Sequence, residues 1–314
     1  MSSFPTQLPT EIVGTLKVCP EIAFADHKGK RKSGIEKTSR KLLTLLQSPL
    51  EKFLDADEIV LSVFRAQSHV SAFRQYTMGI FVYGLTATVV VVTDQRLLQL
   101  RTNSWNRWDH GVRSCKWETV AKALVKGILG KELTLHFLEA KKHRVWKLPG
   151  AQAKVLKKLL PELIQAKHQG RATPGGIHPL CPECKGALTP ANYECPSCKL
   201  LFKNEQKMRW LALLPGAAYF YCGKPILGVM DFLGEGITLL VFIIVTMGAL
   251  LSTDTNPLDW SGLGVTFGFI LFILAIDIAV TIHHCQHFVR DFIPTKEYAQ
   301  TKEQAFSASA GFKT

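Results

Sequence analysis

The spacing of hydrophobic positions changes character along this chain of 314 residues. Over residues 36–54 leucines recur at roughly helical spacing, which predicts a helix interrupted at Pro49. Over residues 59–148 the pattern becomes short runs of β-branched and aromatic residues bounded by polar turns, and it predicts six or seven short antiparallel strands. From about Ala151 apolar residues return to one face, with lysines facing away, and predict a closing amphipathic helix.

Two longer apolar stretches follow, over about 232–251 and 262–282, and each is long enough to cross a bilayer as a helix. A shorter segment, 210–223, is broken at Pro215 and Gly216 and predicts an interfacial or re-entrant element. The loop between the two spans holds two aspartates and no Lys or Arg, whereas both outer flanks are basic. By the positive-inside rule we expect an integral protein of a bacterial inner membrane, with both termini in the cytoplasm.

These patterns predict a multidomain chain. We expect a flexible basic tail, a β-rich domain with a C-terminal helix, a linker, a small zinc ribbon, an α-helical transmembrane domain with its interfacial segment, and a cytosolic tail. The expected ranges, in the same order, are 1–35, 36–168, 169–179, 180–203, 204–288 and 289–314.

Charge is distributed unevenly between the two parts of the chain. Residues 1–180 hold 28 Lys and Arg against 14 Asp and Glu, a net charge of +14, whereas residues 181–314 hold 10 against 11, a net charge of −1. A basic half indicates anionic partners, either lipid headgroups or nucleic acid. Because the apolar spans are covalently attached to it, we expect anionic membrane lipid before nucleic acid.

Four of the eight cysteines stand in a CPEC…CPSC frame, with ten residues between the two pairs. Each Cys-x-x-Cys pair forms a tight knuckle whose thiolates can reach one tetrahedral Zn²⁺. Four thiolates close the coordination sphere and leave no position for a catalytic water, so we expect structural zinc. Redox dithiols and nucleic-acid contact through a ribbon are the alternatives. The expected ligands are Cys181, Cys184, Cys195 and Cys198.

Basic residues and two tryptophans in and near the expected strand turns form a candidate surface for lipid or a protein partner. Each basic residue near an anionic leaflet adds about 1 kcal/mol, and exposed tryptophans suit a membrane interface. The alternative is a solvated basic surface that serves only solubility, with both tryptophans at the edge of the core. The candidate residues are Arg96, Arg101, Trp105, Arg107, Trp108, Lys141, Lys142 and Arg144.

Three carboxylates are candidates for intramembrane chemistry. Asp277 lies inside the second apolar stretch, where an ionisable side chain costs roughly 2.5–3.5 kcal/mol unless it is paired. Asp231 and Glu235 stand four residues apart, on one helical face, near the start of the first stretch. They either bond to nearby tyrosines or Lys224, or handle protons or ions. The second role requires a homo-oligomer, because one hairpin is too small for a transport path.

The β-rich region resembles the bacterial pleckstrin-homology-like (GRAM-like) domain family. The resemblance rests on VVVVTDQRLLQL, an apolar strand running into a Thr-Asp-x-Arg turn, and on Trp117 followed by ELTLHF…HRVWKL and the helix, and it covers roughly 36–168. It implies a β-barrel with a closing helix that binds membrane lipid or another protein and has no catalytic residues. LLPGAAYFYCGKPILG resembles the segment that opens the two-transmembrane-helix domain family.

No stretch of the sequence resembles a nucleotide-binding loop, a Ser/His/Asp arrangement or a zincin motif, so we do not expect an enzyme. We expect a membrane-anchored, cytosol-facing adaptor that recognises anionic lipid or a protein partner, with a zinc ribbon stiffening the connection to the hairpin. One alternative is a small subunit of a membrane transport or channel assembly that uses the intramembrane carboxylates. A weaker alternative is membrane-tethered nucleic-acid binding.

Overall fold

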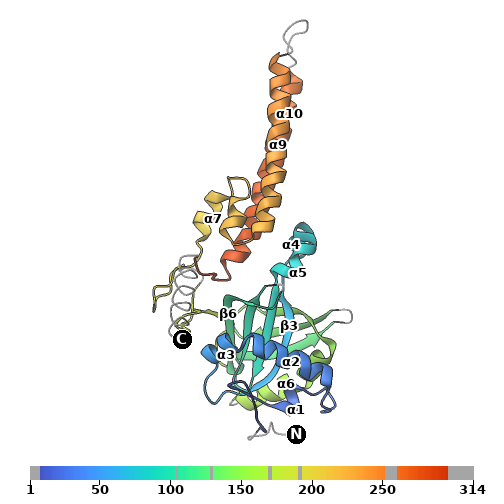
Figure 1. Cartoon of the computed structure of the whole chain (residues 1–314), viewed down its shortest axis with the longest axis vertical. Coiled ribbons are helices and arrows are strands. Elements are labelled where there is room, and N and C mark those ends of the chain that lie inside the picture. Colours follow the sequence, from blue (N-terminus) through green and yellow to red (C-terminus); the bar gives the residue numbers. More distant parts are fainter. Residues whose placement is uncertain are drawn as a thin grey trace, which may run out of the picture. The chain divides into compact units, whose positions relative to one another are not determined.

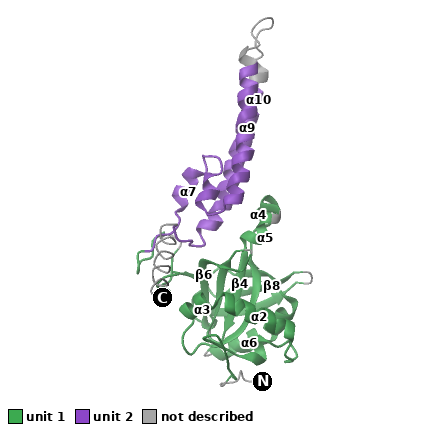
Figure 2. Cartoon of the chain, viewed as in Figure 1, with its two compact units in different colours: residues 1–199 green, residues 200–314 purple. Residues whose placement is uncertain are grey.

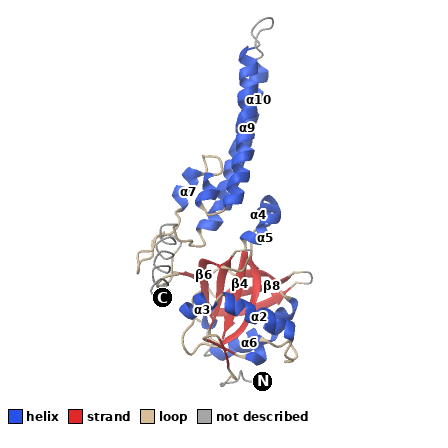
Figure 3. Ribbon diagram, viewed as in Figure 1, coloured by secondary structure: helices blue, strands red, loops and turns tan. Residues whose placement is uncertain are grey.

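A computed structural model describes residues 8–103, 105–127, 130–168, 172–189, 193–251 and 260–295. The chain divides into two compact units, residues 1–199 and residues 200–314, which Figure 2 colours separately. Within the described ranges the first unit holds the strands and helices α1 to α6, and the second unit holds helices α7 to α10 (Figures 1 and 3).

The first unit is built on an antiparallel sheet with the strand order β10-β6-β5-β4-β3-β9-β8-β7. Within β3 to β6, and again within β7 to β9, each strand pairs with the next strand in the sequence. The pairing of β3 with β9 joins these two groups. The strands expected over 59–148 are therefore present. They are β3 (Val60–Ser68), β4 (Ala87–Thr93), β5 (Arg96–Thr102), β6 (Trp108–Lys116), β7 (Val120–Lys126), β8 (Lys131–Phe137) and β9 (His143–Leu148).

Both faces of this sheet are covered by helices. One face packs against α6 (Gly150–Lys167), the expected closing helix, around the fully buried Trp117. The other packs against α2 (Ser33–Leu45) and α3 (Gln47–Phe53). All seven residues of β4 are buried, which explains the unbroken run of four valines over 89–92, since a strand covered on both faces has no solvent side.

Residues 8–35 form strands, a short helix and turns, which corrects the expectation of a flexible tail for this part of 1–35; residues 1–7 lie outside the described chain. β1 (Glu11–Val13) and β2 (Leu16–Val18) form a hairpin, and β2 pairs with β3. The short helix α1 (Pro20–Ala23) follows, and Phe24 after it is fully buried. A strand of three residues is too short to show an alternating hydrophobic pattern in the sequence. These strands are recognised only from their pairing in the sheet.

The connection between β3 and β4 is also different from the prediction. This segment falls in the region where short strands were expected, but it forms helical turns: α4 (Ala72–Met78), η1 (Gly79–Phe81) and α5 (Val82–Leu85). Figures 1 and 3 show α4 and α5 standing beyond the strand ends. Aromatic and β-branched residues matched a strand, but in the structure the segment forms helical turns outside the ladder.

The expected linker is held on the sheet in its described part. β10 (His178–Leu180) pairs with β6, and the amide of Thr173 donates to the carbonyl oxygen of Glu118 at 2.8 Å. Ile177 packs against the core beneath α6. Proline and glycine predicted a loop correctly, but not that its end adds a strand to the sheet.

The second unit is helical. It contains α7 (Glu205–Leu211), α8 (Ala217–Tyr221), α9 (Pro225–Leu251) and α10 (Trp260–Val289). Two stretches, Pro225–Gly248 and Gly264–Val289, are long and apolar enough to cross a membrane, with mean hydropathies of 2.0 and 2.5, and only 11% of each is buried within the protein. The two expected apolar helices are thus present; the expected loop between them lies largely outside the described residues.

The end of the described chain returns to the start of this second unit. The amide of Lys203 donates to the carbonyl oxygen of Ile293 at 3.2 Å, and the rings of Phe202 and Phe292 pack edge to face with centroids 5.5 Å apart. Residues 200–203, which were expected to belong to the ribbon, therefore belong to the second unit. Of the expected C-terminal tail, residues beyond 295 lie outside the described chain.

Candidate functional sites

The four cysteines of the CPEC…CPSC frame come together in the first unit. All four Sγ atoms lie within 4.8 Å of one another, with 3.5 Å between Cys181 and Cys198 and 3.4 Å between Cys184 and Cys195. A Zn–S bond of about 2.3 Å places the thiolates of a tetrahedral site about 3.8 Å apart. The sulfurs therefore stand close to the separations that one tetrahedral ion requires, and the predicted four-cysteine cluster is confirmed.

The two Cys-x-x-Cys pairs fold in the same way. The amide of Lys185 donates to the carbonyl oxygen of Cys181, and that of Lys199 to Cys195, both at 3.0 Å. Both lysines take the left-handed conformation, with φ of 62° and 61°, which residues other than glycine adopt rarely. Each pair thus forms a tight turn of the kind that directs two thiolates toward one ion.

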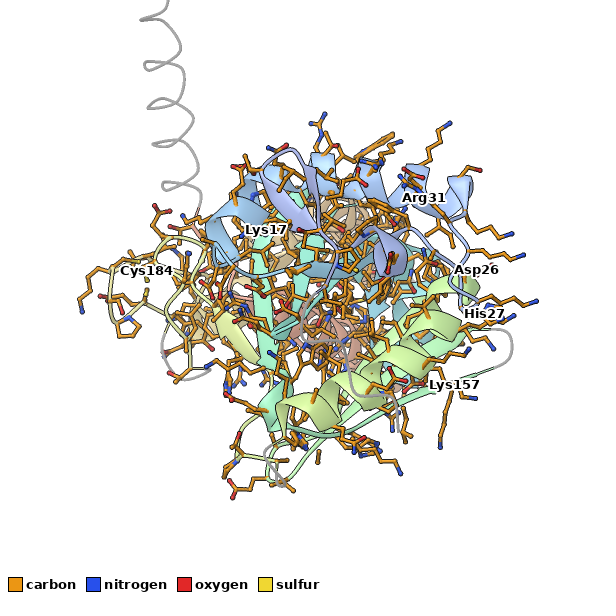
Figure 4. The ribbon with its side chains drawn as sticks, turned by 90° about the horizontal axis from the view of Figure 1, so that it is seen from below. Lys17, Asp26, His27, Arg31, Lys157 and Cys184 are labelled. Atoms are coloured by element: carbon orange, nitrogen blue, oxygen red, sulfur yellow. The ribbon has the colours of Figure 1, made fainter. Side chains whose placement is uncertain are left out.

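The cysteine cluster is tied to the sheet and to a helix. The amide of Leu188 donates to the carbonyl oxygen of Pro179 in β10 at 2.8 Å, and Lys52 on α3 forms an ion pair with Glu183 at 3.3 Å. In Figure 4, Cys184 lies at one side of the first unit. These contacts hold the cluster against the first unit, so a bound metal would stabilise a structure that is already attached.

The residues predicted to bind lipid or a partner divide into buried and exposed groups. Arg96 lies 2.6 Å from Glu58, whose side chain is fully buried, and 3.0 Å from Asp55. Arg101 is buried, with its Nε 3.5 Å from Asp109. Because carboxylates already balance both charges, we remove these two arginines from the candidate binding surface.

Trp108 and Arg144 are half-buried in contacts with the protein itself. The Trp108 ring meets Phe53 edge on at 6.0 Å, and Arg144 lies 3.5 Å from Glu132. Four of the candidates are exposed to solvent. They are Trp105, Arg107, Lys141 and Lys142.

These four exposed residues lie in two turns at one end of the sheet. The pairings Gln67↔Ala87 and Ser68↔Val145 place the end of β3 beside the starts of β4 and β9, and β5 ends beside the start of β4. The β3–β4, β5–β6 and β8–β9 connections therefore leave the sheet at the same end. We call the described residues of these connections, 69–86, 105–107 and 138–142, the rim.

A second basic surface lies where the loop between α1 and α2 meets α6. Lys158 Nζ donates to the carbonyl oxygen of His27 at 3.0 Å, which brings the loop onto the helix. Figure 4 shows His27 and Arg31 on the same side of the unit as Lys157. The sequence analysis had assigned these residues to a flexible tail and a solvated helix face. We call this the basal surface; its exposed cations are Lys28, Lys30, Arg31, Lys32, Lys154, Lys157 and Lys158.

The three intramembrane candidates come together in the second unit. Carboxylate oxygens of Asp231, Glu235 and Asp277 all lie within 4.8 Å of one another, and Glu235 is buried. Asp231 accepts hydrogen bonds from the Gly216 amide at 3.1 Å and from Thr281 Oγ1 at 3.3 Å. Carboxylates this close repel one another when all are charged, so such a cluster can share a proton or hold a cation.

Asp231 also anchors the turn that precedes the apolar helices. Gly216 has φ of +68°, and a Cβ there would lie 2.2 Å from the carbonyl oxygen of Gly228, so the close approach requires glycine. Tyr219 and His284 Nδ1 share a hydrogen bond of 2.7 Å between α8 and α10. The break expected at Pro215 and Gly216 is confirmed, and its role is to let α8 pack against the long helices.

Comparison with known protein families, with characterised proteins and with solved structures found no match. The function is therefore inferred from the chemistry of four groups of residues: the cysteine cluster, the rim, the basal surface and the carboxylate cluster.

Proposed function

We propose that this protein is a membrane-anchored, cytosol-facing adaptor whose first unit binds anionic lipid or a protein partner. The observation that carries this proposal is the presence, in one chain, of a compact basic unit and two long apolar helices that are only 11% buried. Exposed apolar surface costs about 25 cal/mol per Å² in water. Immersion of both helices in a bilayer removes that cost and keeps the basic unit at the membrane surface.

The architecture of the first unit supports its assignment as a pleckstrin-homology-like domain. Two antiparallel groups of strands meet through the pairing of β3 with β9, and α6 closes one face over Trp117. The family resemblance implies a binding module without catalytic chemistry. Four of the eight residues that the sequence predicted for this purpose are exposed on the rim: Trp105, Arg107, Lys141 and Lys142.

The cysteine cluster supports a structural Zn²⁺. Four thiolates supply a complete tetrahedral donor set, and the free energy of binding the metal would fold the two knuckles. Since β10 pairs with β6 and Glu183 pairs with Lys52, zinc would make the segment that leads into the second unit rigid up to Lys199. This is the stiff connection that an anchored binding module would use.

Vesicle binding tests the lipid proposal. The first unit alone, residues 1–199, should bind vesicles containing phosphatidylglycerol at low salt and dissociate as salt rises, because exposed charges are screened. The variant Lys141→Ala/Lys142→Ala should bind about thirtyfold more weakly, since each cation near the leaflet contributes about 1 kcal/mol. The matched basal variant Lys157→Ala/Lys158→Ala should bind as wild type does.

Failure of the first unit to bind anionic vesicles at low salt would rule out lipid recognition. The adaptor would then have to recognise a protein, which co-purification from native membranes would identify.

The carboxylate cluster favours a second candidate function, that of a small subunit of a transport or channel assembly. Asp231, Glu235 and Asp277 gather in the apolar helices, where charged groups are costly and typically mark proton or ion pathways. This role needs a homo-oligomer or larger partner. An Asp277→Asn variant separates the two functions, because an adaptor keeps its localisation and vesicle binding, whereas a proton-handling subunit stays assembled and loses transport.

A further inference from the structure

The β3–β4 connection is longer than a hairpin requires. β4 and β5 are joined through Asp94 and Gln95 alone, whereas residues 69–86 leave the sheet as α4, η1 and α5 before β4 begins. We call residues 71–85 the excursion. The connection contains no Asp or Glu, and its phenylalanines and tyrosines are Phe73, Tyr76, Phe81 and Tyr83.

The excursion has an inner side and an outer side. Met78 and Val82 are buried, and the side chain of Gln67 in β3 donates to the carbonyl oxygen of Tyr83 at 3.3 Å. Phe73, Tyr76 and Tyr83 point outward, with 54%, 87% and 42% of their surface exposed. Large aromatic rings contribute to stability when they are removed from water, so three exposed rings within one connection indicate a surface that is covered in use.

A cation lies beside one of these rings, and others lie at the same end of the sheet. Lys147 Nζ is 3.3 Å from the centroid of the Tyr83 ring, and Trp105, 79% exposed, stands on a neighbouring connection of the same rim. Arg107, Lys141 and Lys142 are exposed there too. Aromatic rings beside cations are the combination that favours the headgroup layer of an anionic bilayer, where the rings enter the interface and the cations meet lipid phosphates.

We propose that the excursion inserts its outer, aromatic side into the interfacial layer of the bilayer. This inference rests on the proposed anchoring by α9 and α10, which keeps the first unit near the surface at high effective concentration. The occupant is the lipid bilayer itself, contacted by Phe73 and Tyr76. With the rim directed to the bilayer, the basal surface faces the cytosol and remains open to a partner.

Photo-crosslinking of the full chain in phosphatidylglycerol-containing vesicles tests this insertion. p-Benzoylphenylalanine replaces Tyr76, and lipid adducts are measured by mass spectrometry after irradiation. The same group at Leu45, an exposed apolar residue of α2, and at Lys157 on the basal surface provides matched controls. We expect lipid adducts at position 76 and few at positions 45 and 157. A fourth position, Ile244 in α9, reports the anchor independently.

The outcomes separate the insertion from the anchoring. Adducts at Ile244 with no more at Tyr76 than at Leu45 would overturn the insertion and leave the anchor intact. Adducts at Lys157 in place of Tyr76 would show that the basal surface faces the bilayer, and adducts of Tyr76 to another protein chain would show that the rings meet protein; both overturn the proposal. An absence of adducts at Ile244 would overturn the anchor and the insertion together.

A second pair of variants tests whether the outer rings cause the insertion. With the photoreactive group at Tyr83, the double change Phe73→Ser/Tyr76→Ser should reduce lipid adducts about fivefold, because interfacial binding scales with buried apolar area. The control Ile12→Ser/Leu45→Ser, which removes exposed apolar residues elsewhere on the first unit, should leave them unchanged. Equal adducts in both variants would contradict the proposal.

Discussion

At the scale of single residues, a buried ion pair secures the turn between β4 and β5. Glu58 accepts hydrogen bonds from Arg96 and from Thr93 Oγ1, the latter at 2.6 Å, and Asp94 accepts from the amide of Ile59 at 2.8 Å. The Thr-Asp-x-Arg turn is therefore a structural element that joins the sheet to the segment before β3. Its arginine forms ion pairs with Glu58 and Asp55.

Replacement of Arg96 should strongly destabilise the first unit. Arg96→Ala leaves the buried Glu58 carboxylate without its charge partner, which typically costs about 3–5 kcal/mol of unfolding free energy. The exposed Arg107→Ala should change it by no more than about 0.5 kcal/mol. Denaturant unfolding followed by tryptophan fluorescence measures both, and equal stabilities would contradict a structural role for Arg96.

His143 should make the first unit sensitive to acid. Its Nε2 lies 2.8 Å from Gln99 Oε1, and burial, assisted by Arg113 and His69, lowers the pKa of His143 to about 3. The unfolded imidazole has a pKa of about 6.5. Between these values only the unfolded chain binds the proton, so the contribution to stability is complete above pH 6.5 and falls by roughly 1.4 kcal/mol per unit as the pH drops toward 3.

Stability measured between pH 7 and 4 in the wild type and in His143→Gln checks this expectation. In the variant, the free energy of unfolding should depend much less on pH over this range. An unchanged pH dependence would assign the acid sensitivity to other groups, such as His69, whose pKa is also lowered by burial.

At the scale of elements, each segment takes the form that its tertiary neighbours allow. β4 carries four consecutive valines because helices cover both faces of the sheet, whereas the apolar and aromatic residues before it form helical turns beyond the strand ends. The cysteine knuckles and the turn at Gly216 depend on the backbone conformation of a few residues. Single substitutions in either element should therefore have large effects.

Zinc removal should loosen the knuckles without unfolding the sheet. We expect one Zn²⁺ per chain by elemental analysis, and faster amide exchange in residues 181–199 after chelation, since metal binding supplies the folding free energy of such sites. Exchange in β4 should not change. Cys184→Ser should lose the metal, whereas Cys115→Ala, a cysteine of the core, should retain it; full zinc in Cys184→Ser would contradict a four-thiolate site.

The turn at Gly216 should not tolerate a side chain. Gly216→Ala places a Cβ against the carbonyl oxygen of Gly228 and forces a positive φ, so the second unit should lose about 2 kcal/mol or more. The control Gly236→Ala adds a methyl group where no atom lies within 4 Å and should be neutral or slightly stabilising. Unfolding in detergent micelles measures the difference, and equal stability would show that the turn is not required.

At the scale of the whole molecule, the two units have different proposed roles: the first binds and the second anchors. The first unit carries the chain's excess positive charge and the surfaces that we propose for binding, and the second carries the apolar helices and the carboxylate cluster. Because the flanks of the two helices are basic, the positive-inside rule leads us to propose that the first unit lies on the cytoplasmic side.

Protease accessibility tests this orientation. In spheroplasts of a bacterial host, added protease should leave residues 1–199 intact, and lysis of the cells should expose them to cleavage. Cleavage of the first unit in intact spheroplasts would reverse the topology and would place the cysteines in an oxidising compartment, where structural disulfides would be expected in place of zinc.

The sequence by itself determined the features that depend on short-range spacing. Periodicity predicted six or seven short strands over residues 59–148 and the buried face of α6; the Cys-x-x-Cys spacing predicted the cysteine cluster; the length of the apolar runs predicted α9 and α10. Each pattern repeats within a few residues, because neighbours along a strand, helix or knuckle are also neighbours in space.

Only the tertiary structure decided which residues meet across long stretches of chain. It paired Arg96 with Glu58, added β1, β2 and β10 to the sheet, turned residues 72–85 into helices and assembled the basal surface from the N-terminal loop and α6. The packing of the whole unit determines which residue pairs with a given charge and which strand pairs with a given sheet edge. Such partners are far apart in the sequence, so no local periodicity predicts them.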